Sequence, residues 1–236
     1  MAQKKLARFS EINTFKNVLQ YPVDMPGKWK DIFKNDNPII LELACGKGEY
    51  TVQLAKRNPG KNYIGVDIKG NRLWVGAKQS IREEITNAFF LRTQIDKIDQ
   101  YFNPGEIKEI WLTFPDPHLR RSKAKKRLTH PKFLRLYQKF LTPGGTIHLK
   151  TDSPDLYQFT RTVIDIYHLD VSEDIDDLYA NEHIEEELRI QTYYESLDIS
   201  KSNKIYYLRF SLPVVMEESD QFLHEVLKKE ELDIHE

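Results

Sequence analysis

The sequence is poor in the residues on which several classes of protein depend. Its 236 residues include a single cysteine, Cys45, which excludes an internal disulfide framework and a cysteine-rich zinc site. No run approaches the roughly 18 consecutive apolar residues of a membrane-spanning helix, and no apolar stretch follows the first residues as in a secretory signal. We therefore expect a cytoplasmic protein that uses neither a membrane nor a metal ion.

The sequence also lacks a large net charge. Its 35 Lys and Arg residues against 36 Asp and Glu residues give a net charge of −1, whereas proteins that coat nucleic acid indiscriminately are usually basic. The charge is unevenly distributed, because residues 120–127 contain basic residues and no acid, while residues 173–187 are strongly acidic. A surface polarised in this way can bind a polyanion locally.

Apolar runs alternate with helical patterns through most of the chain. The expected strands cover residues 39–43, 63–67, 88–91, 110–114 and 146–150. The expected helices cover residues 49–57, 71–84 and 132–141, and another begins at Ser153-Pro154. This alternation is typical of right-handed βαβ units. It predicts an α/β fold with a doubly wound, mostly parallel Rossmann-like sheet that has helices on both faces.

The remaining segments extend this core. Residues 206–212 predict a late, antiparallel strand, and residues 217–236 predict a C-terminal helical tail. No repeat or low-complexity segment marks a boundary between domains. We therefore expect a single domain over residues 1–236, with a core of about 38–212 and a basic N-terminal arm at 1–10.

A glycine-containing turn, Glu42-Leu43-Ala44-Cys45-Gly46-Lys47-Gly48, follows the first expected strand. Gly46 and Gly48 permit positive φ and the close approach of a ligand to the backbone, although a tight turn alone would explain them. Asp67 ends the second strand, where an acid hydrogen-bonds ribose hydroxyls in dinucleotide-binding folds. The turn lacks the full G-x-G-x-x-G pattern. Glu42, at the mouth of the expected site, would repel a diphosphate but suit the cationic amino acid end of S-adenosylmethionine.

A stiff loop with an acid at its centre, Thr113-Phe114-Pro115-Asp116-Pro117-His118, follows the fourth strand. Ligands bind outside the carboxyl ends of parallel strands, so we expect Asp116 to face the cleft, held by its flanking prolines. The basic stretch 120–127 comes next. Together the two features predict a reactive carboxylate beside a phosphate-binding surface; the alternatives are an ordinary turn aspartate and a solvated basic face.

From about Pro38 to Leu212 the chain resembles the bacterial tRNA (guanine-N7)-methyltransferases, which have the class I, S-adenosylmethionine-dependent fold. The resemblance includes the glycine turn, Tyr63 to Asp67, the Phe-Pro-Asp-Pro loop with its basic sequel ending Lys126-Arg127-Leu128, Lys150-Thr151-Asp152, and Thr192-Tyr193-Tyr194-Glu195. The loop with its sequel and the Lys-Thr-Asp triplet are far more specific than the turn. The resemblance implies methyl transfer from S-adenosylmethionine to N7 of the guanine at position 46 in the tRNA variable loop.

The resemblance also implies roles for individual residues. Glu42, Asp67 and the turn glycines Gly46 and Gly48 would contact the cofactor, and Asp116 would both contact the cofactor and act as the catalytic residue. The implied substrate contacts are Arg120, where the family has a lysine, and Asp152, Thr192, Tyr194 and Glu195.

Further departures from the family's pattern occur at three places. Ala44 stands where the family usually has glycine. Gln94 replaces an acid that contacts the adenine, although its amide can still hydrogen-bond the adenine edge, so Gln94 is kept as a cofactor contact. His118-Leu119 replaces Trp-Pro, which affects the stiffness and stacking of the loop but not its charge.

Two other functions compete with this interpretation. A nicotinamide-dependent oxidoreductase could use a similar sheet, but the missing glycines and Glu42 count against it. A non-catalytic RNA-binding module would bind tRNA and transfer nothing. The sequence leaves open whether the protein is a monomer or a homodimer.

Overall fold

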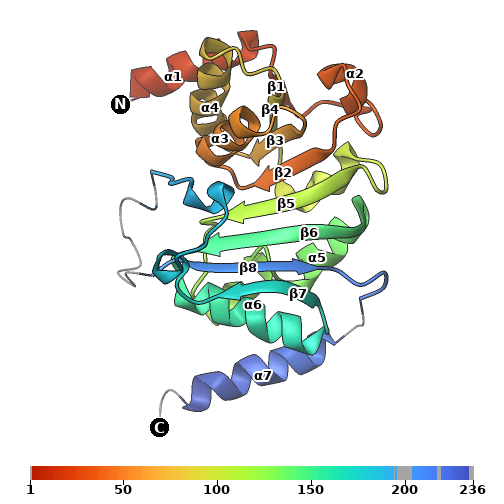
Figure 1. Ribbon diagram of the computed structural model, residues 1–236, viewed down its shortest axis with the longest axis vertical. Helices are drawn as coiled ribbons and strands as arrows, with labels where there is room; N and C mark the ends of the chain where they lie inside the picture. Colours follow the sequence, from red (N-terminus) through yellow and green to blue (C-terminus); the bar gives the residue numbers. More distant parts are fainter. Residues whose placement is uncertain (1, 194, 196–203, 217–218, 234–236) are drawn as a thin grey trace.

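The computed structural model describes residues 2–193, 195, 204–216 and 219–233. They form one eight-stranded sheet in the order β1-β4-β3-β2-β5-β6-β8-β7 (Figure 1). The strands are β1 (Val18–Gln20), β2 (Ile39–Leu43), β3 (Asn62–Asp67), β4 (Ala88–Arg92), β5 (Ile107–Thr113), β6 (Leu141–Thr151), β7 (Asp170–Ile175) and β8 (Tyr206–Ser211). Strands β1 to β6 pair in parallel, and β8 runs antiparallel to both β6 and β7, as expected of the late strand.

Seven α-helices and five short 3-10 helices belong to the described residues. The α-helices are α1 (Ala2–Glu11), α2 (Trp29–Phe33), α3 (Glu49–Arg57), α4 (Gly70–Arg82), α5 (Pro131–Gln138), α6 (Pro154–Ile166) and α7 (Asp220–Asp233). The 3-10 helices are η1 (Ile12–Thr14), η2 (Ile95–Tyr101), η3 (Arg121–Lys126), η4 (Leu178–Ala180) and η5 (Glu186–Arg189). None of these helices is both long enough and apolar enough to span a bilayer.

Both faces of the sheet are buried. Successive side chains of a strand point to opposite faces, and on β2 Ile40 packs in one hydrophobic cluster with Leu54 of α3, while Leu41 packs in another with Phe133 of α5 and Phe159 of α6. Each such aliphatic or aromatic side chain contributes roughly 1.5–3 kcal/mol on burial. Helices therefore cover both faces, which confirms the doubly wound α/β fold.

Helix α6 begins where the sequence predicts. The Ser153 hydroxyl accepts a hydrogen bond from the backbone N–H of Leu156 at 3.2 Å, and Pro154 occupies the first turn. The C-terminal helix α7 docks on this part of the molecule, because Leu223 is buried and Asp220 accepts hydrogen bonds from Arg135 and Tyr167. The expected tail residues 217–218 and 234–236 lie outside the described residues.

The structure differs from expectation at three places. Helix α5 ends at Gln138, and β6 already begins at Leu141 and contains Pro143-Gly144-Gly145, because the pairing with β5 shifts register there and Gly144 adopts a φ of +69°. Strands β1 and β7 are additional; both lie at sheet edges and have few buried side chains. Most of the expected N-terminal arm belongs to helix α1, which contacts α4.

Candidate active site

A cavity of about 1140 Å³ opens at the carboxyl ends of β2, β3, β5 and β6. The chain proceeds from β2 to β3 on one side and crosses to β5 on the other, so the cavity lies at the topological switch point where doubly wound folds bind ligands. The cavity brings together most of the sequence-predicted site residues: Glu42, Gly46, Asp67, Gln94, Asp116, Asp152 and Thr192. Of the others, Gly48, Arg120 and Glu195 do not line it, and Tyr194 lies outside the described residues.

Glu42 lies at the floor of the cavity, not at its mouth as the sequence suggested. Its side chain is buried because β2 is an inner strand covered by α3. The Oε2 atom accepts hydrogen bonds from the backbone N–H and the hydroxyl of Thr51, at 2.7 and 2.5 Å. The Oε1 atom accepts one from the hydroxyl of Thr113 at 2.6 Å.

No cation compensates the Glu42 carboxylate, which makes no ion pair within the described part of the chain. Burial raises the pKa of Glu42 to about 7, and the hydrogen bonds from Thr113 and Thr51 oppose this only partly. A buried carboxylate of this kind can exchange its proton for a cationic ligand near neutral pH.

The turn after β2 is tied to the end of β3. Asp67 accepts hydrogen bonds from the backbone N–H groups of Gly46 at 3.0 Å and Lys69 at 2.7 Å, so its carboxylate joins the two strand ends. Gly48 has a φ of +69°, and a Cβ atom there would lie 2.4 Å from the ring of Phe90. Glycine at this position thus serves backbone geometry and close packing against the sheet.

Ala44 departs from this pattern, since it adopts a φ of +59° without being glycine. The left-handed region favours glycine because it brings the Cβ atom close to the backbone. A glycine would adopt this conformation without that cost, so we expect the alanine to strain the turn.

The loop after β5 presents Asp116 to the cavity. Its side chain is 73% exposed, and its Oδ1 atom accepts a hydrogen bond from the backbone N–H of His118 at 3.1 Å. Phe114 and His118 flank the aspartate with φ values of +48° and +45°, an arrangement that non-glycine residues rarely adopt. Such conformations often occur at functional sites, where the surroundings hold the strained backbone in place.

Arg127 is what holds this loop, and it does not belong to an exposed basic surface as expected. It is buried and donates hydrogen bonds to the backbone oxygens of Pro117 at 3.0 Å, His118 at 3.3 Å and Leu119 at 3.4 Å. Its guanidinium also lies 4.4 Å from the ring centroid of Phe159. The exposed basic side chains of the described stretch are Arg120, Lys123, Lys125 and Lys126.

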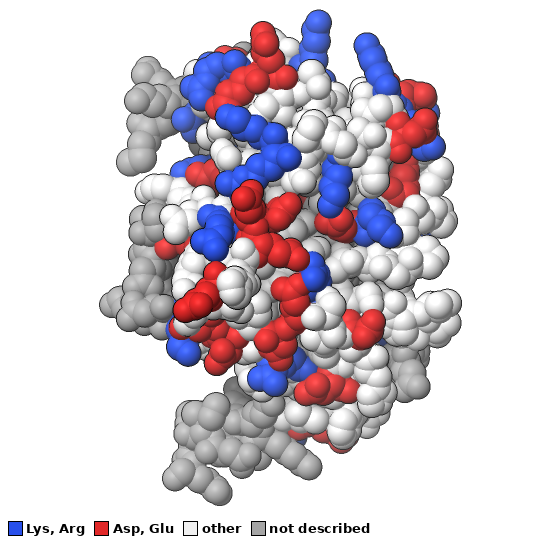
Figure 2. Space-filling model, viewed as in Figure 1, with Lys and Arg blue, Asp and Glu red and all other residues white. Residues whose placement is uncertain are grey.

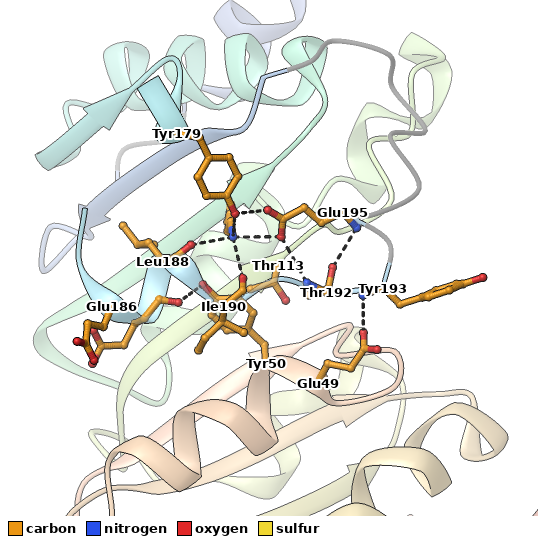
Figure 3. A network of polar contacts seen from close by, with 12 residues as sticks. Glu49, Tyr50, Thr113, Tyr179, Glu186, Leu188, Ile190, Thr192, Tyr193 and Glu195 are labelled. Carbon is orange, nitrogen blue, oxygen red and sulfur yellow. Dashed lines mark hydrogen bonds and ion pairs between the residues drawn. The ribbon is translucent and has the colours of Figure 1, made fainter. Parts of the chain in front are cut away.

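The wall of the cavity that carries Thr192 depends on a buried lysine, Lys150, which the sequence did not assign to the site. The Nζ atom of Lys150 donates hydrogen bonds to the backbone oxygens of Leu188 and Ile190, each at 2.9 Å, to Glu195 Oε2 at 3.2 Å and to the Tyr179 hydroxyl at 3.2 Å. Figure 3 shows these groups converging on one nitrogen atom. Glu195, predicted to contact substrate, is thus engaged with Lys150, while Thr192 lines the cavity.

Charged side chains of both signs lie on one face of the molecule. Figure 2 shows acidic and basic side chains intermingled on the face seen in Figure 1, with acidic ones gathered near its centre. No uniformly basic surface covers that face, in line with the net charge of −1.

Comparisons with known proteins agree with this geometry. A family model described as "Putative methyltransferase" matches residues 36–208. A tRNA (guanine-N(7)-)-methyltransferase from Porphyromonas gingivalis is 49% identical over 213 residues, covering 85% of this chain and 86% of that protein. Another with the same name, from Listeria monocytogenes, is 32% identical over 190 residues, covering 80% and 87%. A solved 30S ribosomal A1408 methyltransferase from an uncultured bacterium shares the fold, with a TM-score of 0.58 and 21% identity over 81% of this chain and 95% of that one.

Proposed function

The chain belongs to the tRNA (guanine-N(7)-)-methyltransferase family, and on that premise we propose that it transfers a methyl group from S-adenosylmethionine to N7 of the guanine at position 46 in the variable loop of tRNA. The observation that carries the proposal is a single cavity lined by Glu42, Asp67, Asp116, Asp152 and Thr192. The partner of the protein is then tRNA, and the protein acts in the cytoplasm. The names of these relatives support the base and the atom, and the sequence resemblance implies position 46.

The residues on the β2 and β3 side fit S-adenosylmethionine. Glu42 is a buried carboxylate with no ion pair among the described residues, as a site for a cationic ligand requires. Asp67 stands at the strand end where an acid binds ribose hydroxyls, Gly46 lines the cavity in the adjoining turn, and Gln94 offers an amide for the adenine edge. When bound, this cofactor supplies an electrophilic methyl group on a sulfonium.

The protein's own task is to orient the guanine, because N7 has a free lone pair and no proton to lose. Asp116 is suited to this, since an exposed carboxylate can accept hydrogen bonds from N1–H and the N2 amine on the edge opposite N7. The same negative charge stabilises a purine that becomes cationic as the new bond forms. Adenine has an acceptor at N1 and is rejected at this edge.

The exposed basic residues hold the tRNA backbone. Arg120, Lys123, Lys125 and Lys126 follow directly after the loop that carries Asp116, and phosphate contacts of this kind position RNA without reading its sequence. Folded RNA is recognised largely by shape and by exposed bases. The target guanine must leave its stack to enter the cavity.

The proposal is tested by methylating two unmodified tRNA transcripts with labelled S-adenosylmethionine, one with guanine and one with adenine at position 46. We expect labelled 7-methylguanosine from the first transcript and none from the second. A different labelled nucleoside, or none, would overturn the activity. Equal 7-methylguanosine from both transcripts would overturn only the position.

Asp116→Asn tests the orienting role in the same assay. The amide points a donor at one of the two guanine donors, so this variant should lose nearly as much activity as Asp116→Ala. Inosine at the target lacks the N2 amine and should reduce the rate less in Asp116→Asn than in the wild type. Losses that simply multiply would show that Asp116 does not contact that edge.

A further inference from the structure

Lys150 is a fully buried cation that joins parts of the chain distant in sequence. Its side chain has no solvent exposure, and its four oxygen neighbours lie 29 to 45 residues further along the chain. Tyr179 also donates a hydrogen bond to Glu195, so the acceptors themselves are linked. An ammonium has three hydrogens and a neutral amine only two, so this shell of acceptors suits the charged form.

Residues 178–193, here called the anchored segment, contain no β-strand, so no sheet ladder holds them beyond the hydrogen bond from the Leu178 N–H to the Ile205 oxygen at 2.7 Å. Lys150 takes the place of that ladder at the end of β6, binding the backbone oxygens of Leu188 and Ile190. Helix α3 holds the other side, where the Tyr50 hydroxyl donates to the Glu187 oxygen at 2.5 Å and Glu49 accepts from the Tyr193 N–H at 3.0 Å. The anchored segment thus spans from α3 to β6 (Figure 3).

The contacts of Lys150 end next to the cavity. Thr192, which lines the cavity, follows Ile190 by two residues. The backbone N–H of Glu195 donates a hydrogen bond to the Thr192 hydroxyl at 3.2 Å. The Glu195 carboxylate cannot turn to a substrate without releasing Lys150. Moving the Lys150 ammonium would therefore displace Ile190 and Glu195, and with them Thr192, which lies between the two in the chain.

We propose that Lys150 is a positioning residue for the substrate side of the cleft: it holds the anchored segment on β6 and thereby sets the place of Thr192 and Glu195 against the tRNA. This inference rests on the proposed function. It concerns the RNA alone, because Glu42 and Asp67 lie on other strands and the oxygen atoms bonded to Lys150 belong to residues between 179 and 195.

The test compares Lys150→Met and Tyr179→Phe with the wild type, measuring kcat/KM for tRNA and the affinity for S-adenosylhomocysteine. We expect Lys150→Met to lower kcat/KM for tRNA on the order of 100-fold, as displaced positioning groups do. Tyr179→Phe, which removes one hydroxyl from a partly exposed side chain, should lower it about 10-fold. Cofactor affinity should stay unchanged in both. Amide exchange at residues 188–193 should become faster in Lys150→Met.

Two controls separate positioning from general loss of stability. Lys56→Met removes an exposed lysine from α3, and Val163→Ala destabilises the core of α6 away from the cleft; neither should change kcat/KM for tRNA. The double variant Lys150→Met/Glu195→Gln should lose less kcat/KM for tRNA than the product of the two single losses, because Glu195 contributes only while Lys150 holds it in position.

The outcomes are distinguishable. A wild type that does not methylate tRNA overturns the proposed function and this inference with it. An active wild type whose variants keep their kcat/KM for tRNA, or lose cofactor affinity in step with it, overturns this inference alone. Should Lys150→Met not fold, Tyr179→Phe and Glu195→Gln decide the matter by the same measurements.

Discussion

The two walls of the cleft each bury an ionisable group, and they treat its charge in opposite ways. On the β2 side, Glu42 is surrounded by hydroxyls and an N–H group, has no ion pair among the described residues, and has its pKa raised to about 7 by burial. On the β6 side, burial lowers the pKa of Lys150, and the adjacent Glu195 carboxylate opposes the shift. One charge lacks a counter-charge, and the other has one within the protein.

This difference distinguishes a binding site from a scaffold. A buried charge costs several kcal/mol unless it is compensated. Lys150 is compensated by the folded chain itself, so it contributes to order whether or not a ligand is bound. Glu42 has no counter-charge in the protein and is therefore partly protonated near pH 7, until a cationic ligand supplies the charge and displaces the proton.

The largest expected effect comes from breaking the compensated pair. Lys150→Met leaves Glu195 without its counter-charge, and removing one partner of a buried pair costs about 3–5 kcal/mol. Urea unfolding should show this loss in the free energy of unfolding. Lys150→Met/Glu195→Gln should recover part of it because the orphaned carboxylate is gone. A loss below about 1 kcal/mol is typical of exposed pairs and would show that Lys150 and Glu195 do not act as a buried, compensated pair.

Neutralising Glu42 should raise the free energy of unfolding, whereas removing the Lys150 charge lowers it. The folded pKa of Glu42 is about 7 against an ordinary value of 4.5, so the folded state binds the proton more tightly. Glu42 therefore lowers stability as pH rises from 4.5 to 7, by about 3 kcal/mol in total. Glu42→Gln should be more stable than the wild type at pH 8 and equal to it at pH 4. Parallel stability curves for the two proteins would contradict this.

The same substitution tests ligand binding. A cationic ligand beside Glu42 lowers its pKa again, so binding of S-adenosylhomocysteine, which keeps the ammonium, should release a proton near pH 6. Calorimetry in buffers of different ionisation enthalpy measures the proton count. Glu42→Gln should release none and bind more weakly. Equal proton release by both proteins would assign it to another group.

A smaller effect should distinguish the exposed lysines of the basic stretch from the buried Arg127. Replacing Lys123, Lys125 and Lys126 with Gln should reduce the log–log salt slope of tRNA binding by roughly one per lost phosphate contact. Arg127→Met should leave the slope unchanged and lower kcat about 10-fold, because it loosens the loop that carries Asp116. Equal slope changes in both variants would return Arg127 to the phosphate surface.

The sequence predicted the inner strands and the cleft well, because buried parallel strands are continuous apolar runs and their carboxyl ends meet at one edge. It missed β7, whose residues Asp170–Ile175 are mostly polar and only partly buried at the sheet edge. It could not separate Arg127 from Lys126, adjacent members of one charge run, nor recognise Lys150 as buried. Both distinctions depend on oxygens supplied by other parts of the fold.

The smallest expected effect tests whether the Glu42 wall is strained in its backbone as well as in its charge. Ala44 adopts a φ of +59°, which costs an alanine roughly 1–2 kcal/mol. Ala44→Gly removes that strain but loses about 0.4–1 kcal/mol because the unfolded chain becomes more flexible. The net gain in the free energy of unfolding should lie between about zero and 1.6 kcal/mol. Ala55→Gly is the control, since Ala55 lies within helix α3, where the same substitution should destabilise by about 1 kcal/mol. Thermal unfolding of both variants beside the wild type measures the two signs. If Ala44→Gly is destabilised as much as Ala55→Gly, the turn is relaxed with alanine in place, and the uncompensated charge of Glu42 is the main local strain on that wall.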